Sequence, residues 1–412
     1  MKRYESYKDS GVYYLPLLPS KWEIKKAKFL FREEKRLPRI NDEIITCFRD
    51  GQVTLRKNRR TEGFTNSLKE IGYKGIRKGD LVIHNMDAFA GAIGVSDSDG
   101  KGTPVYSVCT TLSDNISPYY YCYFLRYLAK CDFIKSLSKG IRERSTDFRY
   151  IDFKELTLPV PSIYEQNKIV EYIDSVTSKI DEAISQQQKM IDLLNERKQI
   201  IIQNAVTKGL DPNAKMKDSG VEWIGEIPED WEISLIGHLF NIKAGGDAKP
   251  KLYSMTKDEI HKYPVYTNCN DSNSVYAYTS IPYFGANTIT VTGRGDIGNA
   301  FFRKTPYDAI IRLLSLKPRI GLDCRFFTFF IDKVIPFTSD SAAVAQLSAV
   351  QLKNIVCCVP SKREQSDIAD SLDDITSKID SSISQCNKMI ALLQERKQII
   401  INDVVTGKIK VV

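Results

Sequence analysis

The residues with the clearest chemistry in this sequence are arginines and lysines that gather in four stretches. Residues 49–60 (RDGQVTLRKNRR) hold five basic residues against one acid, and residues 135–149 (KSLSKGIRERSTDFR) hold five against two. Residues 243–251 (KAGGDAKPK) and 292–304 (TGRGDIGNAFFRK) are similar. Glycine beside a basic residue permits close approach of the backbone to a phosphate strand, and arginine can pair with base edges. A solvated loop is the alternative for any one stretch, but two stretches in each half of the chain favour an anionic partner.

These stretches predict a nucleic-acid contact surface on loops. The formal charge of +8 and the pI of about 8.8 agree with an anionic partner without requiring one. The candidate DNA-binding residues are Arg49, Arg56, Lys57, Arg59, Arg60, Lys101, Arg142, Arg144, Lys243, Lys249, Lys251, Arg294, Arg303 and Lys304.

Catalytic and metal-binding patterns are not evident. None of the three histidines lies in an H-x-x-x-H or H-E-x-x-H arrangement, and His84 is expected at a strand end as a hydrogen-bonding residue. The glycines of residues 292–298 are followed by NAFFRK, which reads as a strand where a dinucleotide fingerprint needs a helix, so a turn in a sheet is expected. No Walker loop and no N-P-P-Y or D-P-P-Y methylation box occurs. We expect no catalytic residue, no metal and no bound cofactor; a stand-alone nuclease is the enzymatic alternative.

The cysteines predict the compartment. There are nine, an odd number, and none lies in a C-x-x-C arrangement, which is typical of free thiols in a reducing environment. The first residues, MKRYESYKDS, have no apolar core of a signal peptide, and no apolar run is long enough to span a bilayer. A cytoplasmic protein is therefore expected.

The elements that must position the basic loops are repeated within the chain. Residues 160–206 and 359–405 share 28 identities in 47 aligned positions. A weaker match relates residues 8–24 (KDSGVYYLPLLPSKWEI) to residues 217–233 (KDSGVEWIGEIPEDWEI). Each half of the chain therefore carries a lead segment, a long variable stretch and a Val-Pro-Ser helix start.

The repeated segments predict two long helices. Ser162 with Glu165, and Ser361 with Glu364, have the spacing of a capping box, and glycines 209 and 407 provide stops. Each helix exceeds 40 residues, on the order of 60 Å. Apolar residues recur at intervals of three and four along both, and the candidate residues for helix pairing and subunit docking are Ile169, Ile173, Ile180, Ile184, Leu194, Ile201, Ile368, Leu372, Ile379, Ile383, Leu393 and Ile400.

A helix of this length needs a partner to cover its apolar seam. The simplest partner is the other copy, which gives an intramolecular antiparallel pair; a homodimeric coiled coil is the alternative. The segments LLNERKQIII and LLQERKQIII place apolar residues beyond one narrow stripe. This wider apolar face predicts a third contact surface, such as another subunit.

The two variable stretches, residues 21–159 and 231–358, share little sequence but have the same character. Both contain short β-rich runs broken by glycine, asparagine, aspartate and proline, with a few helices such as residues 118–130. This predicts α+β domains with small, curved antiparallel sheets. The expected fold is a pseudo-two-fold tandem repeat, in which two globular domains are separated by the antiparallel helix pair.

The chain resembles a known protein family. The segments VPSIYEQNKIVEYID, VPSKREQSDIADSLD, KDSGVEWIGEIPEDW and LVIHNMDAFAGAIGVSDSDGKGTPVYSV are similar to those of specificity subunits (HsdS) of type I restriction-modification systems. The resemblance covers essentially the whole chain. One departure is the pair Cys357 and Cys358, which stands where the first copy has Leu158 and Pro159.

The resemblance implies a function without catalysis by this chain. Each variable segment would be a target-recognition domain that reads one half of an asymmetric, split site in double-stranded DNA. The helix pair would set the spacing and dock modification (HsdM) subunits, typically two, which bind S-adenosylmethionine and methylate adenine. Restriction (HsdR) subunits would add ATP- and Mg²⁺-dependent translocation and cleavage in the full complex.

The expected boundaries follow from the repeat. They are a lead segment at 1–20, the first target-recognition domain at 21–160, the central spacer helix at 161–212, the second domain with its lead at 213–358, and the C-terminal spacer helix at 359–412. Two alternatives remain at this stage: a protein-binding scaffold that never touches DNA, and the target subunit of a related split-site restriction-methylation enzyme.

Overall fold

The chain divides into two compact units in a computed structural model, which describes residues 2–59, 71–137, 147–319, 321–337 and 346–411. Unit 1 comprises residues 1–186 and 388–412, and unit 2 comprises residues 187–387. Each unit contains one globular domain and a part of both long helices, α4 (Ile163–Lys208) and α8 (Lys362–Val405).

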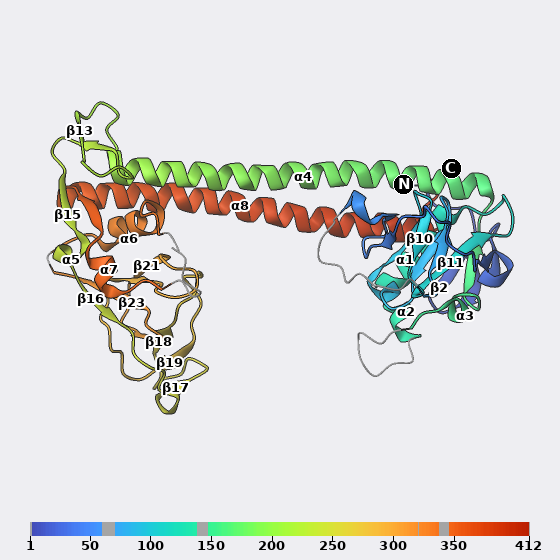
Figure 1. Cartoon of the computed structure of the whole chain (residues 1–412), viewed down its shortest axis with the longest axis horizontal. Coiled ribbons are helices and arrows are strands. Elements are labelled where there is room, and N and C mark those ends of the chain that lie inside the picture. The colour runs from blue at the N-terminus through green and yellow to red at the C-terminus, as the bar shows by residue number, and fades with distance from the viewer. Residues whose placement is uncertain (1, 60–70, 138–146, 320, 338–345, 412) are drawn as a thin grey trace. The chain divides into compact units, whose positions relative to one another are not determined.

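Each globular domain is built on a four-stranded antiparallel sheet covered by a helix (Figure 1). Unit 1 has the strand order β4 (Phe31–Glu33), β11 (Tyr106–Thr111), β8 (Leu81–His84), β9 (Ile93–Val95), with helix α1 (Pro118–Lys130). Unit 2 has the order β16 (Phe240–Ala244), β23 (Leu314–Pro318), β20 (Thr288–Val291), β21 (Ala300–Arg303), with helix α6 (Cys324–Lys333).

The same aromatic contact joins helix and sheet in both units. Phe31 lies edge-on to Tyr121 with 5.3 Å between ring centroids, and Phe240 lies edge-on to Phe327 at 5.2 Å. Two domains that share few sequence motifs therefore have one framework, because large buried rings stand at matching positions.

Two smaller antiparallel pairs also recur. A lead hairpin is formed in unit 1 by β1 (Tyr7–Val12) and β2 (Leu15–Pro19), and in unit 2 by β13 (Met216–Asp218) and β14 (Glu226–Pro228). A second pair directly precedes each long helix: β3 (Glu23–Lys26) with β12 (Thr157–Val160), and β15 (Glu232–Leu235) with β24 (Val356–Val359).

The remaining elements differ between the units. Unit 1 adds two antiparallel strand pairs, β5 (Ile45–Cys47) with β6 (Val53–Leu55), and β7 (Lys74–Ile76) with β10 (Gly100–Gly102). It also adds the short helices α2 (Phe133–Ser136) and α3 (Tyr150–Phe153). Unit 2 adds a second four-stranded sheet of β17 (Tyr253–Ser254), β19 (Ala277–Thr279), β18 (Tyr263–Tyr266) and β22 (Asp308–Ala309), and the helices α5 (Ile236–Leu239) and α7 (Ala349–Lys353).

The long helices begin and end where the sequence predicts. Helix α4 has 46 residues and α8 has 44. The backbone N–H groups of Glu165 and Glu364 donate to the Oγ atoms of Ser162 and Ser361, both at 3.3 Å. Gly209 (φ +75°) and the equivalent glycine at 407 (φ +73°) adopt the left-handed conformation that ends a helix.

Within each unit, α4 and α8 lie side by side and antiparallel (Figure 1). In unit 1 the Nζ atom of Lys397 lies 2.7 Å from a carboxylate oxygen of Asp181, and in unit 2 Lys198 and Asp380 make the same contact at 2.7 Å. Both pairs join residues whose numbers sum to 578, so the two contacts obey one register. The predicted α+β fold with an intramolecular antiparallel helix pair is confirmed.

Candidate nucleic-acid interface

Each domain is attached to its following helix by a buried tryptophan. The indole Nε1 of Trp22 donates to Glu165 at 2.9 Å, and that of Trp231 donates to Glu364 at 2.9 Å. A capping box would return these carboxylates to the helix cap; instead they accept from the indoles, and Glu165 also accepts from the Tyr4 hydroxyl at 2.6 Å.

A buried glutamine forms a second attachment at the same place. The Oε1 atom of Gln166 accepts from the backbone N–H of Ser117 at 2.8 Å, directly before α1. Gln365 accepts from the backbone N–H of Asp323 at 3.0 Å, directly before α6. Since both amides are buried and hydrogen-bonded, they hold the start of each long helix against the start of the helix that covers the sheet.

In unit 1 the candidate basic residues that the structure describes are partly paired with acids on the same surface. Arg49 contacts Asp87 at 2.9 Å, and Lys57 contacts Glu43 at 2.5 Å. Arg59 contacts Asp50 at 2.6 Å, and its guanidinium lies 4.2 Å from the Phe48 ring centroid. Arg56 donates from Nε to Thr46 at 3.3 Å, and Lys101 lies on β10. These residues gather around the β5–β6 pair.

In unit 2 the exposed candidates are four lysines. Lys243 lies on β16, Lys304 directly follows β21, and Lys249 and Lys251 flank Pro250 before the second sheet. The ammonium group of Lys249 lies 5.9 Å from the centroid of the exposed Tyr283 ring. Lysines beside an exposed aromatic ring offer the charge and the stacking surface that nucleic acids use.

The prediction for Arg303 is wrong. This side chain is only 7% exposed, its guanidinium carbon lies 3.6 Å from the Tyr266 ring centroid, and its Nε donates to Thr290 at 2.9 Å. Burial lowers its pKa, and its Nη1 donates to the Ser272 carbonyl at 2.8 Å. The side chain therefore connects the two sheets of unit 2 and has no surface left for a phosphate.

Arg294 lies on the turn between β20 and β21, as expected for a β-turn and not a dinucleotide-binding loop. Its side chain is partly buried, with an Nε that has no hydrogen-bond partner among the described residues. Its backbone N–H donates to Asn268 Oδ1 at 3.3 Å, and that of Gly293 donates to the same atom at 2.7 Å. Arg60, Arg142 and Arg144 lie outside the described residues.

His84 ends β8, and its Nδ1 accepts from the backbone N–H of Asp87 at 3.1 Å, as predicted; burial lowers its pKa. No group of three or more His, Cys, Asp or Glu side chains among the described residues is placed to hold a metal ion. Among those residues, no helix has the length and apolar character needed to cross a membrane.

Comparison with known proteins agrees with this arrangement. Residues 228–390 match the family model of the type I restriction modification DNA specificity domain. A Methanocaldococcus jannaschii protein assigned as the specificity subunit of the type I restriction enzyme MjaX is 26% identical over 96% of this chain and 95% of its own length. A Mycoplasma pneumoniae protein assigned as the type I specificity subunit S.MpnORF89P is 33% identical over 32% of this chain and 39% of its own length.

Solved structures share the fold over almost the whole chain. A chain from a structure of a type I R-M system aligns over 95% of this chain and 99% of its own length, with a TM-score of 0.74 and 15% identity. The HsdS subunit from Thermoanaerobacter tengcongensis aligns over 95% and 98%, with a TM-score of 0.55 and 16% identity.

This chain is similar to the HsdS family of type I restriction-modification specificity subunits.

The long helices of this chain carry an exposed apolar surface that is the same in both copies. Met190, Leu193 and Ile200, here named the α4 strip, are each at least half exposed, with Leu193 at 60%. The α8 strip consists of Met389, Leu392 and Ile399, with Leu392 also at 60%. Intervals of three and seven residues place each strip on one helix face. The strips belong to the wider apolar face that the sequence predicts as a third contact surface.

The residues predicted for helix pairing and subunit docking fall into two groups by burial. Seven of them are buried within this chain, which agrees with a role in packing the helices: Ile169, Ile173, Ile180, Ile368, Leu372, Ile379 and Ile400. The other five are half-buried: Ile184, Leu194, Ile201, Ile383 and Leu393. The exposed strips were not among the predicted residues, although they have the same residue types in both copies at positions outside the seam.

Proposed function

We propose that this specificity subunit reads a split DNA site, with one half-site assigned to each globular domain. The observation that carries this proposal is that the two domains share their sheet order and helix attachments but differ in what they add: the β5–β6 and β7–β10 pairs in unit 1, and a second sheet in unit 2. Equal attachment with unequal surfaces fits two unlike half-sites, so the recognised site is asymmetric and not palindromic.

We assign the reading surfaces to the exposed basic side chains of these added elements. In unit 1 these surround β5 and β6, with Arg59 held by Asp50 and Phe48. In unit 2 they precede the second sheet, with Lys249 beside Tyr283. Lysine and arginine would supply salt-dependent affinity for phosphates, while arginine pairs with guanine edges.

The helix pair sets the spacing of the half-sites in this proposal. Helices α4 and α8 each run without a break from one unit into the other, which suits a fixed separation. Four residues inserted into both helices add about 6 Å of helix length. Such an insertion would lengthen the tolerated DNA spacer by one or two base pairs.

The two strips are the proposed docking surfaces for modification subunits. Two equal apolar surfaces of the same sequence, one in each unit, suit two copies of one partner. The modification subunits would bring S-adenosylmethionine and adenine methylation, and restriction subunits would bring ATP- and Mg²⁺-dependent cleavage. The specificity subunit itself would bind none of these cofactors and catalyse no step.

Methylome sequencing tests the proposal directly. Cells that lack other adenine methylation receive this chain together with its modification subunit, and control cells receive the modification subunit alone. We expect one bipartite, asymmetric motif methylated on both strands, found only with both genes. A continuous or palindromic motif would contradict the assignment of one half-site to each domain.

A protein-binding scaffold is the functional alternative, and salt dependence separates the two. DNA binding by the assembled complex should weaken steeply as salt rises, because phosphate contacts release counterions. Affinity for DNA that is absent, or indifferent to salt, would favour the scaffold. The isolated chain with Mg²⁺ and plasmid should give no cleavage, which tests the nuclease alternative.

A further inference from the structure

The lead hairpins of the two units differ at positions that are exposed in both. Residues 12–19 and 221–228 align without a gap and have nearly the same burial pattern. Tyr13, 93% exposed, and Leu17, 59% exposed, stand in unit 1 where exposed Glu222 and Glu226 stand in unit 2. Exposed apolar side chains at two positions where the other copy has carboxylates are expected on a surface that is covered by a partner.

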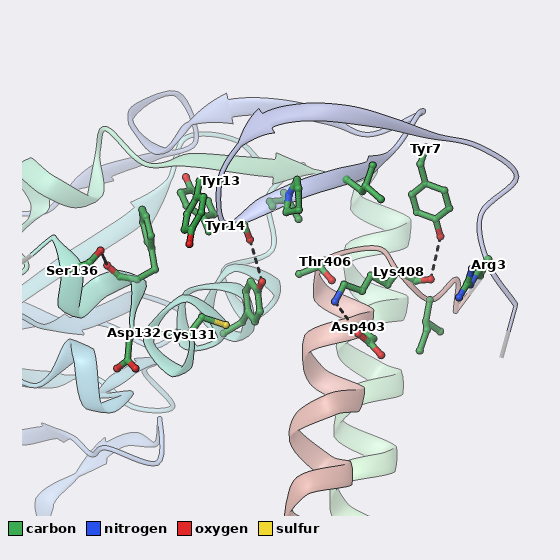
Figure 2. A pocket seen from close by; sticks show the side chains of 16 residues that line it. Arg3, Tyr7, Tyr13, Tyr14, Cys131, Asp132, Ser136, Asp403, Thr406 and Lys408 are labelled. Atoms are coloured by element: carbon green, nitrogen blue, oxygen red, sulfur yellow. Dashed lines mark hydrogen bonds and ion pairs between the residues drawn. The ribbon is translucent and has the colours of Figure 1, made fainter.

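In unit 1 this hairpin forms one wall of a large pocket. The pocket has a volume of about 1050 Å³ and is walled mainly by aromatic and aliphatic side chains, among them Tyr13, Tyr14, Leu17, Tyr127 and Phe133. Tyr14, labelled in Figure 2, and Tyr127 both line this pocket, and the Tyr127 hydroxyl donates to the Tyr14 carbonyl at 3.1 Å.

The pocket continues the α8 strip. Asp403 and Thr406 line it: Asp403 lies four residues beyond Ile399 on the same face of α8, and Thr406 directly follows the last residue of the helix. Lys408, also in the lining, lies 3.4 Å from Asp403, so these two charges are paired with each other (Figure 2). A partner segment that follows the strip along α8 would therefore arrive at an aromatic pocket.

In unit 2 the α4 strip ends differently. Asn204 and Lys208 line a pocket of about 330 Å³, and Pro212 and Glu226 also belong to its lining. Trp223, which occupies the position of Tyr14, packs instead against Phe330 with 6.2 Å between ring centroids. Two equal strips thus lead to unequal ends: a large aromatic pocket in unit 1, and a small one with an acidic rim in unit 2.

We propose that the two modification subunits bind with unequal affinity, the tighter one on the α8 strip, because only there does an aromatic or long aliphatic side chain of the partner enter the hairpin pocket. This inference rests on the docking of modification subunits proposed above. It goes further by assigning the order of assembly and the residues that determine it, namely Tyr13 and Leu17.

Stepwise titration tests this order. The modification subunit is added to the full-length chain, and native mass spectrometry counts the complexes with one and two copies. The first copy should bind about tenfold more tightly than the second, beyond the statistical ratio for two equal sites. Leu392→Glu should remove the tight step and leave the weak one, and Leu193→Glu should do the reverse.

A matched pair of hairpin variants decides the cause. Tyr13→Glu with Leu17→Glu places the residues of unit 2 into unit 1, and the hairpin of unit 2 shows that this turn accepts them. The first affinity should fall about tenfold and meet the second. Glu222→Tyr with Glu226→Leu is the control, which should leave the first step unchanged. Hydrogen exchange confirms that each variant stays folded.

The outcomes distinguish the two proposals. Equal stepwise constants in the wild type, or constants that Tyr13→Glu with Leu17→Glu leaves unchanged, would overturn the order of assembly while docking on the strips stands. No complex at all, or a complex indifferent to both Leu193→Glu and Leu392→Glu, would overturn docking itself.

Discussion

The two globular domains are alike where they meet the long helices and unlike elsewhere. Trp22 and Trp231 donate to the first-turn glutamates at the same 2.9 Å, and Gln166 and Gln365 make the same amide contacts. Beyond these attachments, one domain has two short strand pairs and the other a second four-stranded sheet.

This difference teaches where sequence specificity can change without loss of the fold. Both attachments share a buried tryptophan, a buried glutamine and a four-stranded sheet. Under the proposed function, a domain that keeps this attachment could carry a different reading surface on its remaining elements. The buried guanidinium of Arg303, which contacts Tyr266 and Thr290, shows that a basic residue of the shared sheet can pack against the added sheet.

Removal of the attaching tryptophans should have the largest effect. Trp22→Ala and Trp231→Ala each delete a fully buried side chain and its hydrogen bond, at a cost of about 3–5 kcal/mol in the free energy of unfolding. Hydrogen exchange should show lost protection mainly in the unit that carries the substitution. Trp223→Ala is the matched control, because this third tryptophan is only partly buried and should cost less. Equal loss in both units would contradict separate attachment.

Substitution of the basic side chains should have an intermediate effect and sharpen the contrast between the reading surfaces. If Arg59 and Lys249 contact phosphates, alanine at either position should weaken binding to all DNA sequences and reduce the salt slope by about one. Arg59→Lys separates the two modes, since lysine keeps the charge but loses the bidentate geometry. A base contact would relax one position in the half-site of unit 1, by about 1–3 kcal/mol. Binding assays with each half-site scrambled in turn measure this; an effect of Arg59→Ala on the other half-site would contradict the assignment.

Local signals made the helices predictable. Ser162, Ser361 and the two stop glycines act within one turn of the helix ends, so their consequences can be read from neighbouring residues. The antiparallel pairing follows as well, because a helix of 46 residues must cover its apolar seam and an identical seam is available in the same chain.

The features that could not be predicted depend on contacts between residues far apart in the sequence. In the sequence Arg303 resembles other basic loop residues, but in the structure its guanidinium lies on the ring of Tyr266 from β18. Glu165 has the spacing of a capping residue, but its carboxylate accepts a hydrogen bond from Trp22, which is 143 positions away. The common sheet order was equally hidden, because register between distant strands is not encoded in either strand alone. Leu193 and Leu392 could have been separated from the seam only by knowing which helix face is covered.

The smallest expected effect concerns the two ion pairs between α4 and α8. Their loss and rescue test whether the two helices pair within one chain in the observed register. Asp181 with Lys397, and Asp380 with Lys198, are partly exposed, so each should contribute only about 0.2–1 kcal/mol and less at high salt. In a double-mutant cycle Asp181→Lys should be rescued by Lys397→Asp and not by Lys198→Asp, because Lys198 pairs with the other copy's aspartate. Chemical denaturation of the monomeric chain measures the coupling. Rescue by either lysine would mean that the helices can shift or exchange partners. The two ion pairs would then not fix a single register of the helix pair.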